Sequence, residues 1–290
     1  MLSFHRILFP VDFSSRCTDT SPYVASIARK SASEVVLLHA FGIYNGVPYG
    51  DASPTIVYAA YEDVIRQSRV AELENFGYED FKDLKVTRTI EVGEAAEAIA
   101  QYVAEHGIDL VVMPTHGHAR FRQFLLGSVT SKVLHDVPCP VWTTAHSEIL
   151  VSRAFEQIHT IVCAVDLSSD TPVVVRAACE MACRYGGTVQ LVHAISSPEL
   201  ENGYVENAPF QRFLFDAANE RLAAMQRELQ THFDGCIRHG NVAAVVAEAA
   251  ANCGAQLVVV GRGRIQKTLG RFRTNMAAII RESPCPVLSV

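Results

Sequence analysis

A long internal repeat is the feature that most constrains the fold of this chain. Residues 7–12 read ILFPVD and residues 161–166 read IVCAVD, so each position corresponds to one 154 residues later. The same offset places VLLHA at 36–40 on QLVHA at 190–194. A unit of about 145–150 residues has the size of a domain and is much longer than a solenoid repeat. The sequence therefore predicts two copies of one domain.

Composition agrees with two soluble domains that each bury a core. The chain has 290 residues, of which 49% are hydrophobic and 19% are charged, and its net charge is −6. This balance disfavours a nucleic-acid partner bound through a basic surface. The sequence contains no run of about 18 uncharged apolar residues, so we expect no membrane-spanning helix. The short apolar run at 7–11 ends at Asp12, unlike the apolar region of a leader peptide. Eight scattered cysteines favour reduced thiols and a cytoplasmic location.

Apolar runs that alternate with amphipathic segments predict an α/β fold in both copies. In the first copy we expect strands at 6–11, 35–41, 85–91, 110–113 and 141–145, and helices at 21–31, 55–76, 94–106 and 128–136. In the second we expect strands at 159–165, 188–195, 236–238, 257–261 and 287–290, and helices at 172–185, 208–233, 242–253 and 274–282. Because the strands are almost continuously apolar, the sheets are expected to be parallel and covered on both faces. The prediction is two tandem, doubly wound, five-stranded, Rossmann-like domains at 1–146 and 158–290, joined by a linker at 147–157.

The segment from Leu110 to Val141 has the order of an anion-binding loop. An apolar strand leads into a loop that returns to a helix beginning near Ser128. The amides at a helix amino terminus attract anions, and Gly117 and Gly127 would let the backbone approach a phosphate closely. The loop has no acidic residue, and its basic residues are His116, His118, Arg120 and Arg122.

The second copy of this loop is different. Gly261 and Gly263 are present, but the segment is one residue shorter and Arg273 and Thr274 stand where Gly127 and Ser128 stood. This loop contains five basic residues and no acidic residue. We interpret it as a degenerate site, with an anion site as the open alternative. Asp166 keeps the position of Asp12.

These residues resemble the universal stress protein family in its tandem form. The family's ATP signature, Gly-x2-Gly-x9-Gly-(Ser/Thr), corresponds to Pro114, Gly117, Gly127 and Ser128, so that three of four positions match. The resemblance implies an adenine nucleotide alpha hydrolase-like domain that binds ATP, with or without magnesium, at the carboxyl ends of its strands. The nucleotide contacts that the resemblance implies are Asp12 on the nucleoside, Ala40 on adenine through its backbone, and Gly117, Gly127, Ser128 and Val129 on the phosphates.

At Pro114 the sequence differs from the family's ATP signature, which has glycine there. The second domain has weaker counterparts of the nucleotide contacts. Proline lacks an N–H, so a ligand contact through that amide is lost. The second-domain counterparts are Asp166, Gly261, Gly263 and Thr274. The last strands of family domains commonly pair, which implies an intramolecular pseudo-dimer in which 141–145 meets 287–290. Whether two chains assemble further stays open.

Simpler roles remain open for several of these residues. The simpler role for Asp12 is to cap the following helix without contacting a ligand. The simpler role for Gly127 and Ser128 is an ordinary loop and helix cap. His39 and His193 are expected in the core or beside the site, and Cys179 with Cys183 is expected to pack rather than bind a metal.

No catalytic or metal-ligand pattern is apparent in the sequence, so we expect a binding protein and not an enzyme. We expect a stress-response protein that binds an adenine nucleotide mainly in its first domain. A slow ATPase and a nucleotide-free interaction scaffold are the alternatives.

Overall fold

A computed structural model describes residue 2 and residues 4–42, 54–117, 126–144, 158–196, 208–262 and 271–290, without the side chains of 54–62 and 271–274. Its contacts divide the chain into two units. The amino-terminal unit comprises residues 3–123 and 127–140, and the carboxy-terminal unit comprises 141–290 with 1–2 and 124–126. Each unit is described by itself below.

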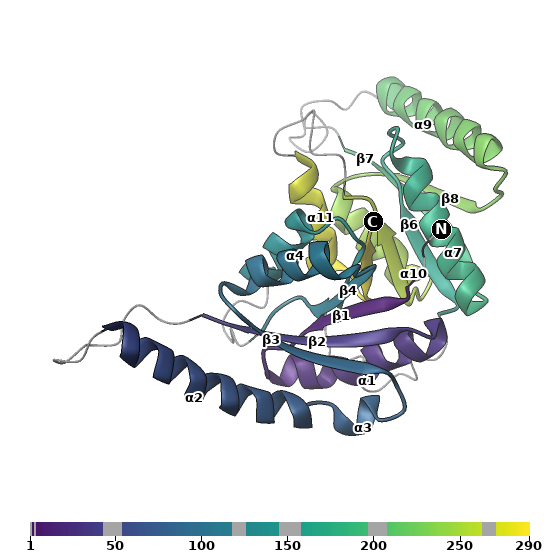
Figure 1. Ribbon diagram of the computed structural model, residues 1–290. Coiled ribbons are helices and arrows are strands. Elements are labelled where there is room, and N and C mark those ends of the chain that lie inside the picture. Colours follow the sequence, from purple (N-terminus) through teal and green to yellow (C-terminus); the bar gives the residue numbers. More distant parts are fainter. Residues whose placement is uncertain are drawn as a thin grey trace. The chain divides into compact units, whose positions relative to one another are not determined.

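The amino-terminal unit alternates strands and helices along the chain (Figure 1). Its strands are β1 (Arg6–Pro10), β2 (Glu34–Phe41), β3 (Val86–Val92) and β4 (Leu110–Pro114). Its helices are α1 (Ser15–Ser31), α2 (Pro54–Asn75), α3 (Tyr78–Phe81), α4 (Ala95–His106) and α5 (Ser128–Asp136). The strands pair in parallel in the order β3-β2-β1-β4.

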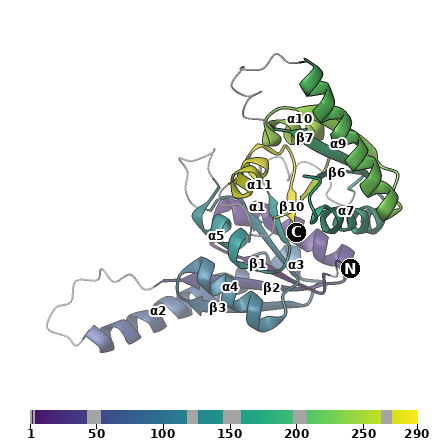
Figure 2. The ribbon, with the colours of Figure 1, turned by 90° about the horizontal axis from the view of Figure 1, so that it is seen from above.

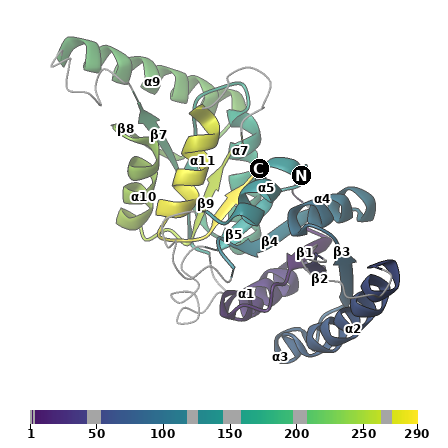
Figure 3. The same cartoon turned by 90° about the vertical axis from the view of Figure 1, so that its left-hand side faces the viewer.

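Helices cover both faces of this sheet, as a doubly wound fold requires. Helices α1, α2 and α3 lie on one side of strands β1 to β4, and α4 and α5 lie on the other (Figure 3). Strand β4 is buried along its whole length, and Ile7, Leu8 and Phe9 of β1 are fully buried. Burial on both faces explains why these strands read as unbroken apolar runs. The predicted α/β class is confirmed.

Helix α1 begins six residues earlier than the predicted helix at 21–31. Ser14 caps it by accepting a hydrogen bond from the amide of Cys17, and Pro22 lies inside it. Proline lacks the N–H that would reach the carbonyl of Thr18. The Ser21 hydroxyl lies 3.1 Å from that carbonyl but also contacts the Asp80 carboxylate, which is the stronger acceptor for its one proton. The helix nevertheless continues through its proline.

The carboxy-terminal unit repeats the order of elements. Its strands are β5 (Val141–Thr144), β6 (Thr160–Ala164), β7 (Thr188–Ile195), β8 (Asp234–His239), β9 (Leu257–Val260) and β10 (Val287–Ser289). Its helices are α7 (Thr171–Tyr185), α9 (Ala208–Leu229), α10 (Val242–Asn252) and α11 (Arg271–Glu282). The strand order is β5-β10-β9-β6-β7-β8. Helices α7 and α9 lie on one side of β6 and β7, and α10 and α11 lie on the other (Figure 2).

The last strands of the two repeats pair, as the family resemblance implied. Strand β5 runs antiparallel to β10, with Trp142 opposite Leu288, and both side chains are fully buried. Strand β5 thus lies beside the final strand of the second repeat. The predicted domain limits and the linker at 147–157 stay predictions, because residues 145–157 lie outside the described chain.

Some element limits differ from the sequence-based expectation. Helix α11 begins at Arg271 and not at 274, so Thr274 lies inside the helix, and the short helix α3 was not predicted. Most of the predicted loop 42–54 lies outside the described residues, as do His118, Arg120 and Arg122. No helix of the described residues is long and apolar enough to cross a membrane.

Candidate functional site

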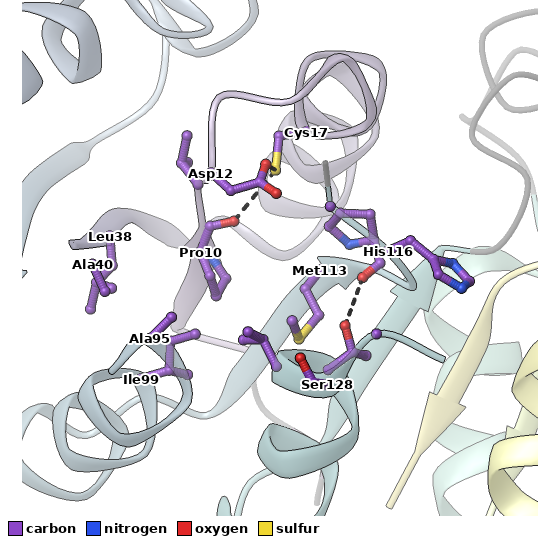
Figure 4. Close-up of a pocket in the computed structure, with 16 residues that line it drawn as sticks. Pro10, Asp12, Cys17, Leu38, Ala40, Ala95, Ile99, Met113, His116 and Ser128 are labelled. Atoms are coloured by element: carbon purple, nitrogen blue, oxygen red, sulfur yellow. Dashed lines mark hydrogen bonds between the residues drawn. The ribbon is translucent and has the colours of Figure 1, made fainter. Parts of the chain in front are cut away.

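A pocket of about 290 Å³ opens in the amino-terminal unit where β1, β2 and β4 end (Figure 4). This volume is near the lower end of small-molecule sites. The carboxyl edge of an open parallel sheet is where such folds bind ligands. All seven residues predicted in the first domain line it, namely Asp12, Ala40, Pro114, Gly117, Gly127, Ser128 and Val129.

The lining changes from apolar to polar across the pocket. Leu38, Ala40, Ala95 and Ile99 lie together at one side, whereas Ser128 lies at the other (Figure 4). Strand β2 supplies the first two of these side chains, and α4 supplies the next two. The pocket therefore suits a ligand with a flat apolar part and a polar or anionic part.

Asp12 follows β1 in a strained turn. The next residue, Phe13, has φ of 60°, which is uncommon for a residue with a large side chain. The Asp12 Oδ1 atom accepts hydrogen bonds from the Ser14 amide at 2.9 Å and from the Cys17 thiol at 3.0 Å. Both bonds are made to Oδ1, and the other carboxylate oxygen, Oδ2, is directed towards Gly117.

Gly117 has no room for a side chain. A Cβ atom at this position would lie 2.0 Å from Asp12 Oδ2 and 3.3 Å from Asp12 Cγ. The Gly117 carbonyl accepts a hydrogen bond of 3.1 Å from the Arg16 guanidinium on α1. Glycine is thus required here because the loop passes directly against the Asp12 carboxylate, which is a steric reason within the protein itself.

The amino end of α5 differs in two ways from the sequence-based expectation. The helix cap is Gly127 and not Ser128, and it offers no side-chain cap. The Gly127 amide donates to the Thr115 carbonyl at 2.9 Å, so it is engaged within the loop. A Cβ at Gly127 would meet the same carbonyl at 3.1 Å. Close packing of the loop on the helix explains both corrections.

Pro114 is integrated into this packing. It is the last residue of β4, and its carbonyl accepts a hydrogen bond of 3.2 Å from the buried Thr130 hydroxyl on α5. Strand β4 pairs with β1 at Leu110 and Val111, so the missing N–H of Pro114 lies beyond this pairing, at the end of the strand. The Thr130 contact ties the strand to the helix whose first residues line the pocket.

His39 supports the Asp12 turn from β2. Its Nδ1 lies 2.7 Å from the Val11 carbonyl, and because a carbonyl only accepts, that nitrogen carries the proton. The ring packs against Phe13 at a centroid distance of 4.5 Å. Burial is the main cause that lowers the pKa of His39. The expectation that His39 is a core residue beside the site agrees with these contacts.

Cys17 also lines the pocket, although the sequence did not single it out. The residue is buried, and burial followed by the Asp12 charge raises the pKa of its thiol well above the usual range. The sulfur therefore keeps its proton and acts as a donor.

The carboxy-terminal unit repeats the aspartate turn, and most of the segment after β9 lies outside the described residues. Asp166 Oδ1 accepts from the Ser168 amide and from the Thr171 hydroxyl, both at 3.0 Å, and Leu167 has φ of 58°. A Cβ at Gly261 would meet the Val174 side chain at 2.8 Å. Gly263 and the Thr274 side chain lie outside the described residues.

No metal cluster was expected, and among the described residues no group of three or more His, Cys, Asp or Glu side chains is arranged to hold a metal ion. None of the eight cysteines, all of which lie in the described residues, forms a disulfide, and Cys179 lies half-buried on α7. Burial is also the largest cause that raises the pKa of Cys179.

A parallel α/β unit that occurs twice along one chain, with a pocket at the strand ends of the first copy, defines a tandem α/β protein of the doubly wound class. The sequence profile described as "Universal stress protein family" matches residues 3–144 and again residues 157–290. The chain belongs to the universal stress protein family, in its tandem form.

Individual relatives agree with this assignment. Universal stress protein MJ0577 of Methanocaldococcus jannaschii is 27% identical over 150 residues, which are 48% of this chain and 93% of that protein. Universal stress protein Slr1230 of Synechocystis is 46% identical over 52 residues, 18% of each chain. The crystal structure of a universal stress protein from Archaeoglobus fulgidus matches with a TM-score of 0.68 at 19% identity. That match covers 100% of this chain and 97% of the other, and it shows a shared fold.

Proposed function

We propose that this protein binds an adenine nucleotide, ATP in the first instance, in the pocket of its amino-terminal unit, as part of a response to stress. The observation that carries the proposal is that seven residues from four separate segments, selected by sequence alone, line one pocket. The family resemblance supplies the ligand class, and the change from apolar to polar lining fits a nucleotide.

The lining suggests how the nucleotide lies. The base occupies the apolar side, against Leu38 and Ala40. The Asp12 carboxylate contacts the nucleoside, as the family resemblance implies, while its Oδ1 atom also accepts hydrogen bonds from Ser14 and Cys17. The phosphates lie at the amino end of α5, where the amides of Ser128 and Val129 have no partner in a preceding helical turn. Gly127 contributes by lacking a side chain, because its amide is engaged with Thr115.

The carboxy-terminal unit is proposed to hold a degenerate site. The sequence supports this, because Arg273 and Thr274 stand where Gly127 and Ser128 stand in the first repeat. The aspartate turn nevertheless persists at Asp166. An anion site in the loop at 263–270 stays a prediction, since those residues are not described.

The two matching aspartates allow a direct test. Calorimetric titration of the full chain with ATP is compared with Asp12→Asn and Asp166→Asn, which change equivalent positions in the same way. We expect Asp12→Asn to weaken binding by at least about tenfold, or about 1.4 kcal/mol, and Asp166→Asn to leave it unchanged. The reverse pattern would move the site to the second unit. Absence of binding by the folded wild type at millimolar ATP would remove the proposal.

Binding without efficient hydrolysis is the proposed activity. Phosphoryl transfer needs metal ligands and a positioned base at the terminal phosphate, and magnesium at this site stays a prediction. A slow ATPase in the same pocket is the alternative. It predicts metal-dependent ADP release that disappears in Asp12→Ala, whereas simple binding predicts no ADP above the level of that variant.

Two further proposals concern the whole protein. The antiparallel pairing of β5 with β10 supports an intramolecular pseudo-dimer of the two domains. The eight cysteines, none of them in a disulfide, support a cytoplasmic location, since reduced thiols persist there.

A further inference from the structure

Two different residues make the same contact in the two repeats. Cys17 lies five residues after Asp12, and its thiol donates to Asp12 Oδ1 at 3.0 Å. Thr171 lies five residues after Asp166, and its hydroxyl donates to Asp166 Oδ1 at 3.0 Å. In each repeat the same oxygen also accepts the amide two residues after the aspartate. The structural demand is therefore for a short side chain with a proton to donate.

The thiol has a choice of acceptors, and the distances decide between them. Its sulfur lies 3.8 Å from the Pro10 carbonyl but 3.0 Å from the Asp12 carboxylate. A charged acceptor also binds a donor more strongly than a neutral one. The single thiol proton is therefore assigned to Asp12 Oδ1. Figure 4 draws the sulfur beside this carboxylate at the edge of the pocket.

Two donors on one oxygen fix the orientation of the carboxylate. The Ser14 amide and the Cys17 thiol donate to Oδ1 from two different positions, so the thiol adds a second restraint on rotation of the Asp12 side chain. The other oxygen is then directed at Gly117, where the loop leaves no room for a side chain. We propose that Cys17 is a positioning residue, which holds Asp12 in the orientation that binds the nucleotide. This inference rests on the proposed function.

A purely structural role for Cys17 makes a different prediction. If the buried side chain only filled space, a residue of similar shape without a donor would serve equally well. Threonine and valine have nearly the same shape and differ in one hydroxyl group, so they separate donation from packing. Threonine is also the residue that performs this contact at position 171.

The test compares ATP affinity in full-length wild type, Cys17→Thr and Cys17→Val, with Cys139→Val as control. Cys139 is another buried cysteine of the same unit that does not line the pocket. We expect Cys17→Thr to stay within about twofold of wild type, Cys17→Val to lose at least about tenfold, and Cys139→Val to keep its affinity. Equal affinities of the valine and threonine variants at position 17 would overturn the inference.

A measurement without nucleotide separates this inference from the proposed function. The Ser14 amide donates to the same oxygen, so its hydrogen exchange, followed by NMR, reports whether the carboxylate stays in place. We expect protection at Ser14 in wild type and Cys17→Thr, and faster exchange in Cys17→Val. Unchanged protection in Cys17→Val would overturn the inference. If wild type failed to bind ATP, the proposed function would fall while the Ser14 amide still decided the role of Cys17.

Discussion

Gly117→Ala tests whether the loop and Asp12 form one unit. The added Cβ would lie 2.0 Å from Asp12 Oδ2, whereas non-bonded carbon contacts are favourable only at about 3.5–4.0 Å. Relief requires the carboxylate to move by more than about 1 Å. That movement breaks the hydrogen bonds of Oδ1 with Ser14 and Cys17.

The cost follows from those two bonds. A hydrogen bond to a charged group contributes about 1.5–3 kcal/mol, but Asp12 is half-buried, and a displaced carboxylate regains water. We therefore expect Gly117→Ala to lower the free energy of unfolding by about 1.5–3 kcal/mol, the value of one bond and not of two. ATP affinity should fall by at least about tenfold, because the displaced carboxylate enters the pocket.

Urea unfolding followed by circular dichroism measures the first quantity, and calorimetry measures the second. Gly42→Ala is the matched control, because its Cβ would meet the Gly93 carbonyl at an ordinary 3.7 Å. A double-mutant cycle with Asp12→Ala isolates the clash, since Gly117→Ala should then cost little. The reasoning is refuted if Gly117→Ala costs as much without the Asp12 carboxylate as with it.

Two further predictions concern the supports of the site. Burial lowers the pKa of His39 in the folded chain, so the unfolded chain takes up a proton first as pH falls. The resulting stability is fully present above about pH 6.5 and declines below it; His39→Gln should flatten this dependence in urea melts, and an unchanged slope would contradict it. Thr130→Val removes the donor to the Pro114 carbonyl and should cost about 1 kcal/mol; a variant as stable as wild type in urea would show that this bond contributes nothing.

The repeat made most of the site predictable. Matching positions in the two halves identified the aspartate turn, and the glycine spacing identified the loop, without knowledge of how they meet. The strand ends of a parallel sheet then brought Asp12, Ala40 and Gly117 to one edge. Hydrophobic periodicity indicates the topology that brings these residues together, whereas the choice of Asp12 and Ala40 as nucleotide contacts came from the family resemblance.

The individual hydrogen bonds could not be predicted in this way. The roles of Cys17 and Thr130 depend on side-chain directions that sequence spacing does not fix, and the Gly127 amide was expected to face a ligand until its partner Thr115 was known. The early start of α1 was missed because a proline is expected in the first turn of a helix, whereas Pro22 lies inside α1. One signal was available, since Cys17 and Thr171 occupy equivalent positions and both can donate.

The number of ATP molecules bound per chain tests the account most directly. Equilibrium dialysis of the full chain against ATP should give one nucleotide per chain, because the account assigns binding to the amino-terminal pocket and a degenerate site to the other unit. Asp12→Asn should abolish that single site. Two nucleotides per chain, or one that survives Asp12→Asn, would contradict the account.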